Sequence, residues 1–334
     1  MKWRAAFILL MLSITVDADT LRVASIQFES IDGAFDQNLQ SATRLIRQAK
    51  ARGAELALLP EFSLIGYTLS EDMWRHGEKM GGPTQAALAA LAISNGMYLA
   101  TTLLEVDGEH FFNTFVLLGP DGDLLGAVRK QKPAGAEGYF FRGDDNPHTI
   151  PTPLGRIGVG ICQENYRCFL PQELHTMDAD LVLMPFSYPD LSASGGLGSP
   201  AGAYIASWYA TQLGIPVVTS NKTGTWPQVE GAYFPGASTI AQAGGTIAGE
   251  LDANPGVLVV DITLDETQKR APSMACVGPF IQDLTLGSWL EKRLTWIMIW
   301  IYGVFGVNPE AEVERSYADN HNRRAAALDV SSSN

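Results

Sequence analysis

Short apolar runs alternate with amphipathic runs along most of this sequence, and that alternation limits the possible folds more than any other feature. Residues 21–28, "LRVASIQF", predict a strand because the run is rich in β-branched and aromatic residues. Over 39–49 the apolar residues recur at helical spacing, and Gly53 can end that helix. The short apolar run that follows, "ELALLP" at 55–60, predicts a buried strand.

The same alternation continues through the middle of the chain. Pro83 can open a second helix and Gly96 can close it. The runs 97–106 and 110–120 predict a strand pair, and the turn "PDGD" leads into another strand over 124–132. Later strands are expected at 155–162, 180–185, 215–221 and 256–262, with a helix near 203–213. The pattern therefore predicts a single α/β domain with helix-covered sheets over residues 19–265.

Composition and charge narrow the class of protein. The chain has 334 residues, of which 46% are hydrophobic and 18% are charged, so it carries enough apolar material for a large core. Its formal net charge is −13. Because an acidic surface repels phosphate backbones, nucleic acid is not expected as a partner.

Residues 1–18 have the pattern of a signal peptide. Lys2 and Arg4 form a short positive region, and 5–16 is an apolar run of the appropriate length. Residues 16–18, "VDA", place small side chains where a signal peptidase reads the chain. An uncleaved N-terminal anchor is the alternative, but the run is shorter than the roughly 20 residues that a membrane span needs. We therefore expect an exported protein, either periplasmic or secreted.

Cysteine and histidine usage argues against several kinds of site. Three cysteines, Cys162, Cys168 and Cys276, are too few for a disulfide framework, and an odd number leaves one thiol free unless it pairs between chains. The five histidines lack metal-ligand spacing, so no metal site is expected. No GxSxG nucleophile elbow occurs. The Gly-rich stretch 195–202 lies about ten residues from the nearest strand, so we interpret it as a flexible loop and expect no cofactor.

Three chemically active groups stand where apolar strands end: Glu61 after "LALLP", Lys130 in "LLGAVRK" and Cys162 after "GRIGVGI". In α/β proteins such positions face the crevice in which ligands bind. A carboxylate there can take the thiol proton, and the thiolate can attack a carbonyl-type carbon. The ammonium and the backbone N–H of Gln163 can hold the resulting oxyanion. Each residue alone has a plain alternative, namely a buried apolar Cys, a helix-capping Glu and a surface Lys.

These motifs and their order resemble those of the carbon–nitrogen hydrolase (nitrilase) superfamily over residues 21–262. "LALLPEFSLIGY" resembles the Glu motif, "LLGAVRK" the Lys motif and "GRIGVGICQEN" the Cys motif. The resemblance implies a four-layer α-β-β-α sandwich. It also implies that Glu61 is the general base, Lys130 the catalytic lysine and Cys162 the nucleophile. We prefer Lys130 to Lys132 because it aligns with the end of the strand.

Further site residues follow from the same resemblance. Glu137, in "AEGYFFRGDD", matches the family's second glutamate, which orients the site beside the lysine. Phe186 and Tyr188 occupy positions that line the substrate pocket in relatives. The residue after the nucleophile is often Trp in true nitrilases and is Gln163 here, which favours an amide-type substrate. A thiol suits such a site because it ionises near neutral pH when a base and a cation lie beside it.

The resemblance predicts hydrolysis of a non-peptide carbon–nitrogen bond in a small molecule, of amide or N-carbamoyl type, through a cysteine thioester. Acylation would release ammonia or an amine, and water activated by Glu61 would then release the acid. The alternatives are an acyltransferase or a nitrilase of the same superfamily, and a non-catalytic binding protein on the same fold.

Residues 266–334 form a C-terminal extension beyond the resemblance. Its segment 294–307 carries no charge, and as a helix it would be about 21 Å long, which is short of the roughly 30 Å hydrocarbon core of a bilayer. The segment can pack on its own domain, against another subunit or in a membrane interface. We expect one of the two intermolecular contacts, and hence a homo-oligomer or a membrane contact. The rest of the extension is expected to be a polar, flexible tail.

Export makes a direct prediction about the mature protein. Cleavage after residue 18 is expected to leave Asp19 at the N-terminus, just before the strand at 21–28. Mass spectrometry of the protein recovered from an exporting host measures this end. An intact Met1 on protein that stays in the cytoplasm would contradict both the cleavage and the export.

Overall fold

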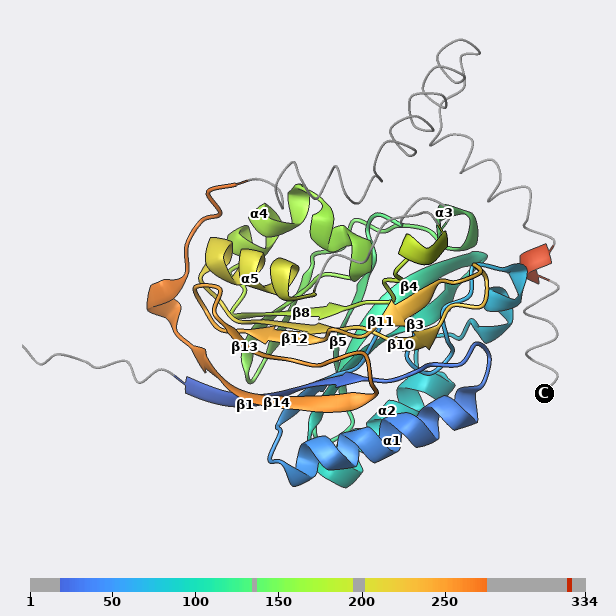
Figure 1. The fold of residues 1–334 in the computed structure, drawn as a ribbon, viewed down its shortest axis with the longest axis horizontal. Coiled ribbons are helices and arrows are strands. Elements are labelled where there is room, and N and C mark those ends of the chain that lie inside the picture. The colour runs from blue at the N-terminus through green and yellow to red at the C-terminus, as the bar shows by residue number, and fades with distance from the viewer. Residues whose placement is uncertain (1–18, 134–136, 195–201, 275–322, 326–334) are drawn as a thin grey trace, which may run out of the picture.

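Two six-stranded sheets lie face to face, and helices cover the outer face of each (Figure 1). The computed structural model describes residues 19–133, 137–194, 202–274 and 323–325. The strand order in the first sheet is β14 (Gly256–Leu264), β1 (Asp19–Gln27), β2 (Leu56–Leu58), β3 (Tyr98–Asp107), β4 (His110–Leu118) and β5 (Leu124–Arg129). The order in the second is β13 (Ile247–Glu250), β12 (Thr239–Ala241), β9 (Val217–Ser220), β8 (Leu181–Pro185), β7 (Gly155–Val159) and β6 (Thr149–Thr152). A separate two-stranded ribbon pairs β10 (Thr223–Thr225) with β11 (Tyr233–Pro235).

The helices complete an α-β-β-α arrangement, which confirms the predicted fold class. Helices α1 (Phe35–Ala51) and α2 (Pro83–Asn95) lie on the first sheet, and α4 (Phe169–Thr176) and α5 (Gly202–Leu213) lie on the second (Figure 1). The short helix α3 (Glu137–Phe140) follows β5. Single 3₁₀ turns are η1 (Glu71–His76), η2 (Cys162–Tyr166), η3 (Ser192–Ser194) and η4 (Glu266–Gln268).

Strand β2 shows why the buried strands could be read from the sequence. Its three residues, Leu56, Ala57 and Leu58, are fully buried. The two leucines belong to the core between the sheets, whereas Ala57 belongs to the core under α1 and α2, which also contains Leu45 and Leu88. Successive side chains of a strand point to opposite faces, so a strand covered on both faces must be apolar at every position.

Two reciprocal hydrogen bonds join the sheets at their centre. The Ser25 hydroxyl of β1 donates to the Thr219 carbonyl of β9 at 2.6 Å. The Ser220 hydroxyl of β9 donates to the Ile26 carbonyl of β1, also at 2.6 Å. Both serines are fully buried, and these bonds satisfy polar groups that the packed sheets exclude from water. They therefore fix the position of β9 relative to β1.

The carboxyl ends of strands from both sheets meet at one place. Strands β1, β2 and β3 run parallel, and so do β7, β8 and β9. Strand β5 runs in the direction of β3 because both are antiparallel to β4. The backbone N–H of Glu61, just after β2, donates to the Phe186 carbonyl, just after β8, at 3.3 Å. The segments that follow β2 and β8 are therefore in direct contact.

The structure contains elements that the sequence pattern did not predict. Strands β6 and β10–β13 have three or four residues each, which is too short to show a periodic pattern. Cys168 lies at the N-cap of α4 and is disulfide-bonded. Cys162 is the free cysteine in the described part of the chain.

Two predicted segments lie outside the described residues: the signal peptide, 1–18, and the apolar segment, 294–307. Within the ranges that the structure describes, no helix is long and apolar enough to cross a membrane.

Part of the tail that the sequence predicts to be flexible packs against the domain. Residues 323–325 are helical, and the Arg324 side chain is 2% exposed. Its guanidinium carbon lies 5.6 Å from the ring centre of Trp74 in η1. Arg323 forms an ion pair with Glu71 at 2.5 Å on the exposed side. A buried cation on an aromatic face stabilises this contact more than an exposed ion pair does.

We therefore expect Arg324→Ala to lower the melting temperature by about 2–4 °C, which corresponds to about 1 kcal/mol for a domain of this size. The neighbouring variant Arg323→Ala is the control and is expected to change it by less than 1 °C or so, because its partner Glu71 is solvated. Thermal melts followed by circular dichroism measure both. Equal melting temperatures for the two variants would mean that the buried contact with Trp74 is not stabilising.

Candidate active site

Glu61 is held rigidly at the end of β2. Its backbone N–H binds the Phe186 carbonyl, and its carbonyl accepts a hydrogen bond from the Ser187 hydroxyl at 2.9 Å. Its carboxylate oxygen Oε1 accepts the Asn113 side-chain amide at 2.6 Å. The side chain is fully buried, and the other oxygen, Oε2, has no hydrogen-bond partner among the described residues. One carboxylate oxygen is thus fixed and the other remains available.

Lys130 lies between two carboxylates. Its ammonium nitrogen is 3.2 Å from Glu61 Oε1 and 3.0 and 2.8 Å from the two oxygens of Glu137. Its backbone N–H donates to the Asn113 carbonyl at 2.8 Å, so Asn113 positions both Lys130 and Glu61. Burial lowers the pKa of Lys130, but the charges of Glu137 and Glu61 outweigh burial and hold it well above its usual value. Lys130 therefore stays an ammonium ion.

Glu137 is the first residue of α3, seven residues after Lys130. The side chain is 1% exposed, and the Tyr67 hydroxyl donates to its Oε1 at 2.8 Å. The nearby residue Lys132 is exposed, so its side chain lies outside this cluster. The structure thus brings together Glu61, Lys130 and Glu137, which the sequence had placed in one site.

Cys162 is the first residue of η2, at the backbone turn that follows β7. Its φ is +53°, in the left-handed region that a residue with a side chain rarely adopts. The Asn165 amide clamps the turn by donating to the carbonyls of Gly160 and Cys162, both at 2.9 Å. A side chain at Gly160 would collide with the Asn165 amide oxygen, so glycine is required there. Gln163 follows within η2, and its backbone role stays a prediction.

The resting thiol differs from the sequence prediction. We expected it to ionise near neutral pH, but its pKa is held well above the usual value. Burial has the largest effect, and the negative charge of Glu61 adds to it, whereas Lys130 and a hydrogen bond from the Ser187 backbone oppose it. Two carboxylates lie near one ammonium, so the local field disfavours a thiolate. Cys162 is therefore protonated at rest and must lose its proton during attack.

Glu164 links the Cys162 turn to the segment after Lys130. Its Oε2 accepts the Ile161 backbone N–H at 3.2 Å, and its Oε1 accepts the backbone N–H groups of Gln131 and Lys132. The side chain is fully buried. Sequence analysis missed this residue, because its partners Gln131 and Lys132 are more than 30 residues away along the chain and only a polar residue next to an apolar strand marks it.

The His148 ring contacts the carboxylates of both Glu164 and Glu173. Its Nε2 is 3.4 Å from Glu164 Oε1, and its Nδ1 is 3.1 Å from Glu173 Oε1. Burial lowers the pKa of His148, but hydrogen bonds to the two carboxylates raise it overall to about 9. The imidazolium is therefore a structural charge that balances Glu164.

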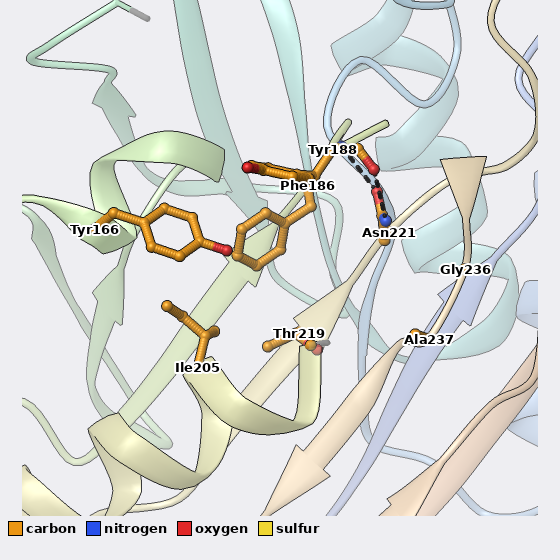
Figure 2. A pocket seen from close by; sticks show the side chains of 9 residues that line it. Tyr166, Phe186, Tyr188, Ile205, Thr219, Asn221, Gly236 and Ala237 are labelled. Carbon is orange, nitrogen blue, oxygen red and sulfur yellow. Dashed lines mark hydrogen bonds between the residues drawn. The ribbon is translucent and has the colours of Figure 1, made fainter. Parts of the chain in front are cut away.

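Phe186 and Tyr188 line a pocket in the structure (Figure 2), and its role in binding substrate stays a prediction. Figure 2 shows the Tyr166 and Phe186 rings side by side above Ile205, with Asn221 bonded to the Tyr188 backbone at 3.0 and 3.2 Å. All nine lining residues are uncharged: Tyr166, Phe186, Tyr188, Gly202, Ile205, Thr219, Asn221, Gly236 and Ala237. Burial, then the charges of Tyr188 and Cys162, raise the pKa of Tyr166.

Residues 22–271 match the family model described as carbon-nitrogen hydrolase. A nitrilase from Pyrococcus abyssi is 27% identical over 254 residues, covering 73% of this chain and 91% of that protein. An N-carbamoylputrescine amidase from Arabidopsis thaliana is 27% identical over 268 residues, covering 75% of this chain and 89% of that protein. Nitrilase 3 from Arabidopsis thaliana is 27% identical over 221 residues, and this match covers 60% of this chain and 59% of that protein.

Solved structures share the fold. A carbon–nitrogen hydrolase from Helicobacter pylori G27 superposes with a TM-score of 0.67 at 19% identity, covering 75% of this chain and 90% of that chain. A mutant amidase from Nesterenkonia sp. AN1 superposes with a TM-score of 0.63 at 23% identity, covering 73% of this chain and 90% of that chain. That amidase carries the acetamide moiety of fluoroacetamide on its active-site cysteine.

The contacts of His148 with Glu164 and Glu173 predict a loss of stability at high pH. The pKa of His148 is raised from 6.5 to about 9, so its contribution is fully present below pH 6.5 and is lost as the pH rises through 9. We expect His148→Gln to lower the free energy of unfolding by about 2–4 kcal/mol at pH 6 and by much less at pH 10. Denaturant melts at the two pH values measure the difference. A deficit that does not vary with pH would contradict a charged His148, and His175→Gln serves as the control.

Proposed function

The chain belongs to the carbon–nitrogen hydrolase family, and from this premise we propose that it hydrolyses a carbon–nitrogen bond of an amide or N-carbamoyl compound through a thioester on Cys162. The observation that carries the proposal is the buried cluster of Glu61, Lys130 and Glu137, whose charges all act on the Cys162 thiol. The proposal assigns Glu61 as the base, Lys130 as the fixed cation and Cys162 as the nucleophile, the three groups that this reaction needs.

Acylation starts from the protonated thiol. Glu61 Oε2 accepts the thiol proton while the Cys162 sulfur forms a bond to the substrate carbonyl carbon. The Lys130 ammonium and the Gln163 backbone N–H stabilise the negative oxygen of the tetrahedral intermediate. When the carbon–nitrogen bond breaks, Glu61 returns the proton to the leaving nitrogen, and ammonia or an amine departs.

Deacylation uses the same groups in reverse. Glu61 takes a proton from a water molecule, whose oxygen attacks the thioester carbon. The carbon–sulfur bond then breaks, the acid is released and the proton returns to the sulfur. Because Glu137 and Asn113 hold Lys130 and Glu61 throughout, the catalytic groups need no rearrangement between the two half-reactions.

The pocket supports an uncharged, partly apolar acyl group. Tyr166, Phe186 and Ile205 form an apolar wall, while Asn221 and Thr219 supply the polar side chains. The relatives include an N-carbamoylputrescine amidase and an amidase with a cysteine adduct, which supports an amide-type substrate. Nitrilases of similar identity make nitriles the second candidate class.

Ammonia release from matched amides, N-carbamoyl amines and nitriles separates these substrate classes. An added amine acceptor tests whether the acyl group is transferred to an amine instead of to water.

We also propose that the protein is exported. The disulfide at Cys168 supports this, because disulfides persist in oxidising compartments outside the cytosol. Strand β1 begins at Asp19, so cleavage after residue 18 would leave the sheet intact. Self-association or membrane contact through 294–307 remains a proposal from the sequence alone.

Cys162→Ala is expected to reduce ammonia release from the best amide by at least about 1,000-fold, because the thioester cannot form. Lys130→Ala is expected to cause a loss of similar size, because the oxyanion loses its cation. Circular dichroism at 25 °C checks that each variant is folded.

Cys168→Ser is the matched control and is expected to keep most of the activity, since that sulfur is held in a disulfide and cannot act as a nucleophile. The proposed mechanism is wrong if Cys162→Ala keeps more than about a tenth of the wild-type rate. Mass spectrometry after rapid acid quenching should show the acyl group on wild-type Cys162 and on no other residue.

A further inference from the structure

A second lysine, Lys222, is fully buried two residues after the end of β9. Its ammonium nitrogen donates to the Phe62 carbonyl at 3.3 Å. It lies 5.9 Å from the ring centres of both Tyr67 and Phe234, at distances typical of cation–aromatic attraction. The mechanism above assigns this residue no role, although a buried lysine is costly unless its charge is used.

The contacts of Lys222 lead directly to the catalytic carboxylates. Phe62 is the residue after Glu61 and has a φ of +48°, so Lys222 binds the turn that presents Glu61. Tyr67, whose ring faces the Lys222 ammonium, donates its hydroxyl to Glu137. Lys222 therefore touches the supports of both carboxylates and neither carboxylate itself.

The net negative charge of the buried cluster explains why a second buried cation is stable near it. The cluster of Glu61, Glu137 and Lys130 carries two negative charges and one positive charge, all fully buried or nearly so. An uncompensated buried charge is strongly unfavourable. With the Lys222 ammonium included, the four side chains carry two negative and two positive charges.

The charged groups that face Lys222 come from several elements. Burial lowers its pKa, the carboxylates of Asp32 and Glu61 and the Cys162 sulfur raise it, and the result is about 7. Asp32 itself is held by the Tyr67 backbone N–H at 2.9 Å and the Gln228 amide at 2.7 Å. Lys222 is thus a cation below neutral pH and largely neutral above it.

We propose that Lys222 is a second cation of the active site, a positioning residue that stabilises negative charge on Glu61 and on the Cys162 sulfur without touching the substrate. This inference deepens the proposed function of the same site. It predicts the reactivity of the Cys162 thiol, which can be measured without substrate turnover. The inference about Lys222 and the proposed function can therefore be disproved independently.

The sign of the effect follows from the charge state. A neighbouring cation favours the thiolate, so the effect of Lys222 is present below pH 7 and fades as the pH rises through 7. Methionine has a similar length and no charge at any pH, whereas arginine keeps its charge throughout. The three side chains therefore predict three different pH profiles for the reactivity of Cys162.

The test is the rate at which iodoacetamide alkylates Cys162 in the full-length mature protein, followed by intact mass. In this reaction the sulfur forms a bond to the CH₂ carbon, iodide leaves and the thiol proton passes to Glu61 or water. Cys168 is disulfide-bonded and does not compete.

We expect Lys222→Met to react about tenfold more slowly than wild type at pH 6 and at the same rate at pH 9. Lys222→Arg is expected to match wild type at pH 6 and exceed it at pH 9.

Lys269 provides a matched control, because it is a partly buried lysine paired with Asp178, Asp180 and Glu266 at the opposite end of β8. Lys269→Met is expected to leave both alkylation rates unchanged. A wild-type rate for Lys222→Met at pH 6 would overturn the proposal, and so would a deficit of equal size at both pH values, which would indicate a structural role only. If Lys222→Met does not fold, the alkylation rate of Lys222→Arg at pH 9 tests the proposal instead. A rate above wild type supports it, and a rate equal to wild type overturns it.

Discussion

The buried ammonium of Lys130, held within 3.2 Å of Glu61 and Glu137, is the interaction on which the rest of the site depends. The three residues come from the segments after β2 and β5 and from α3, so the ion pairs also join separate parts of the first sheet. Breaking such a buried arrangement by removing one partner commonly costs about 3–5 kcal/mol. The catalytic geometry and the local stability therefore have the same physical origin.

The Cys162 turn is attached to this cluster by polar side chains rather than by packing alone. Asn165 holds the backbone of the turn, and Glu164 joins it to the residues after Lys130. His148 in turn balances the charge of Glu164. Connected hydrogen bonds between buried polar groups rigidify the backbone that they hold. This is how a left-handed backbone at Cys162 can persist.

The electrostatics of the resting site are arranged for proton transfer and not for a preformed thiolate. Burial and the carboxylate of Glu61 keep the Cys162 thiol protonated, and one oxygen of Glu61 has no hydrogen-bond partner among the described residues. Lys130 then becomes most useful as negative charge develops on the substrate oxygen. Lys222, which donates to the Phe62 carbonyl next to Glu61, completes the charge balance of the buried groups.

Sequence alone determined the α/β class with helix-covered sheets and the residues at the strand ends, because strands buried on both faces read as short apolar runs and a polar residue after one marks the end of the strand. Glu61, Lys130 and Cys162 were found in this way, and the family resemblance added Glu137. The four-layer arrangement also followed from the family resemblance. Tertiary structure alone decided the roles of Asn113, Glu164 and Lys222, whose partners lie up to 160 residues away. It also decided the charge state of Cys162, because a pKa is set by burial and by the distances to charges that the folded chain brings together, and neither quantity can be read from local order.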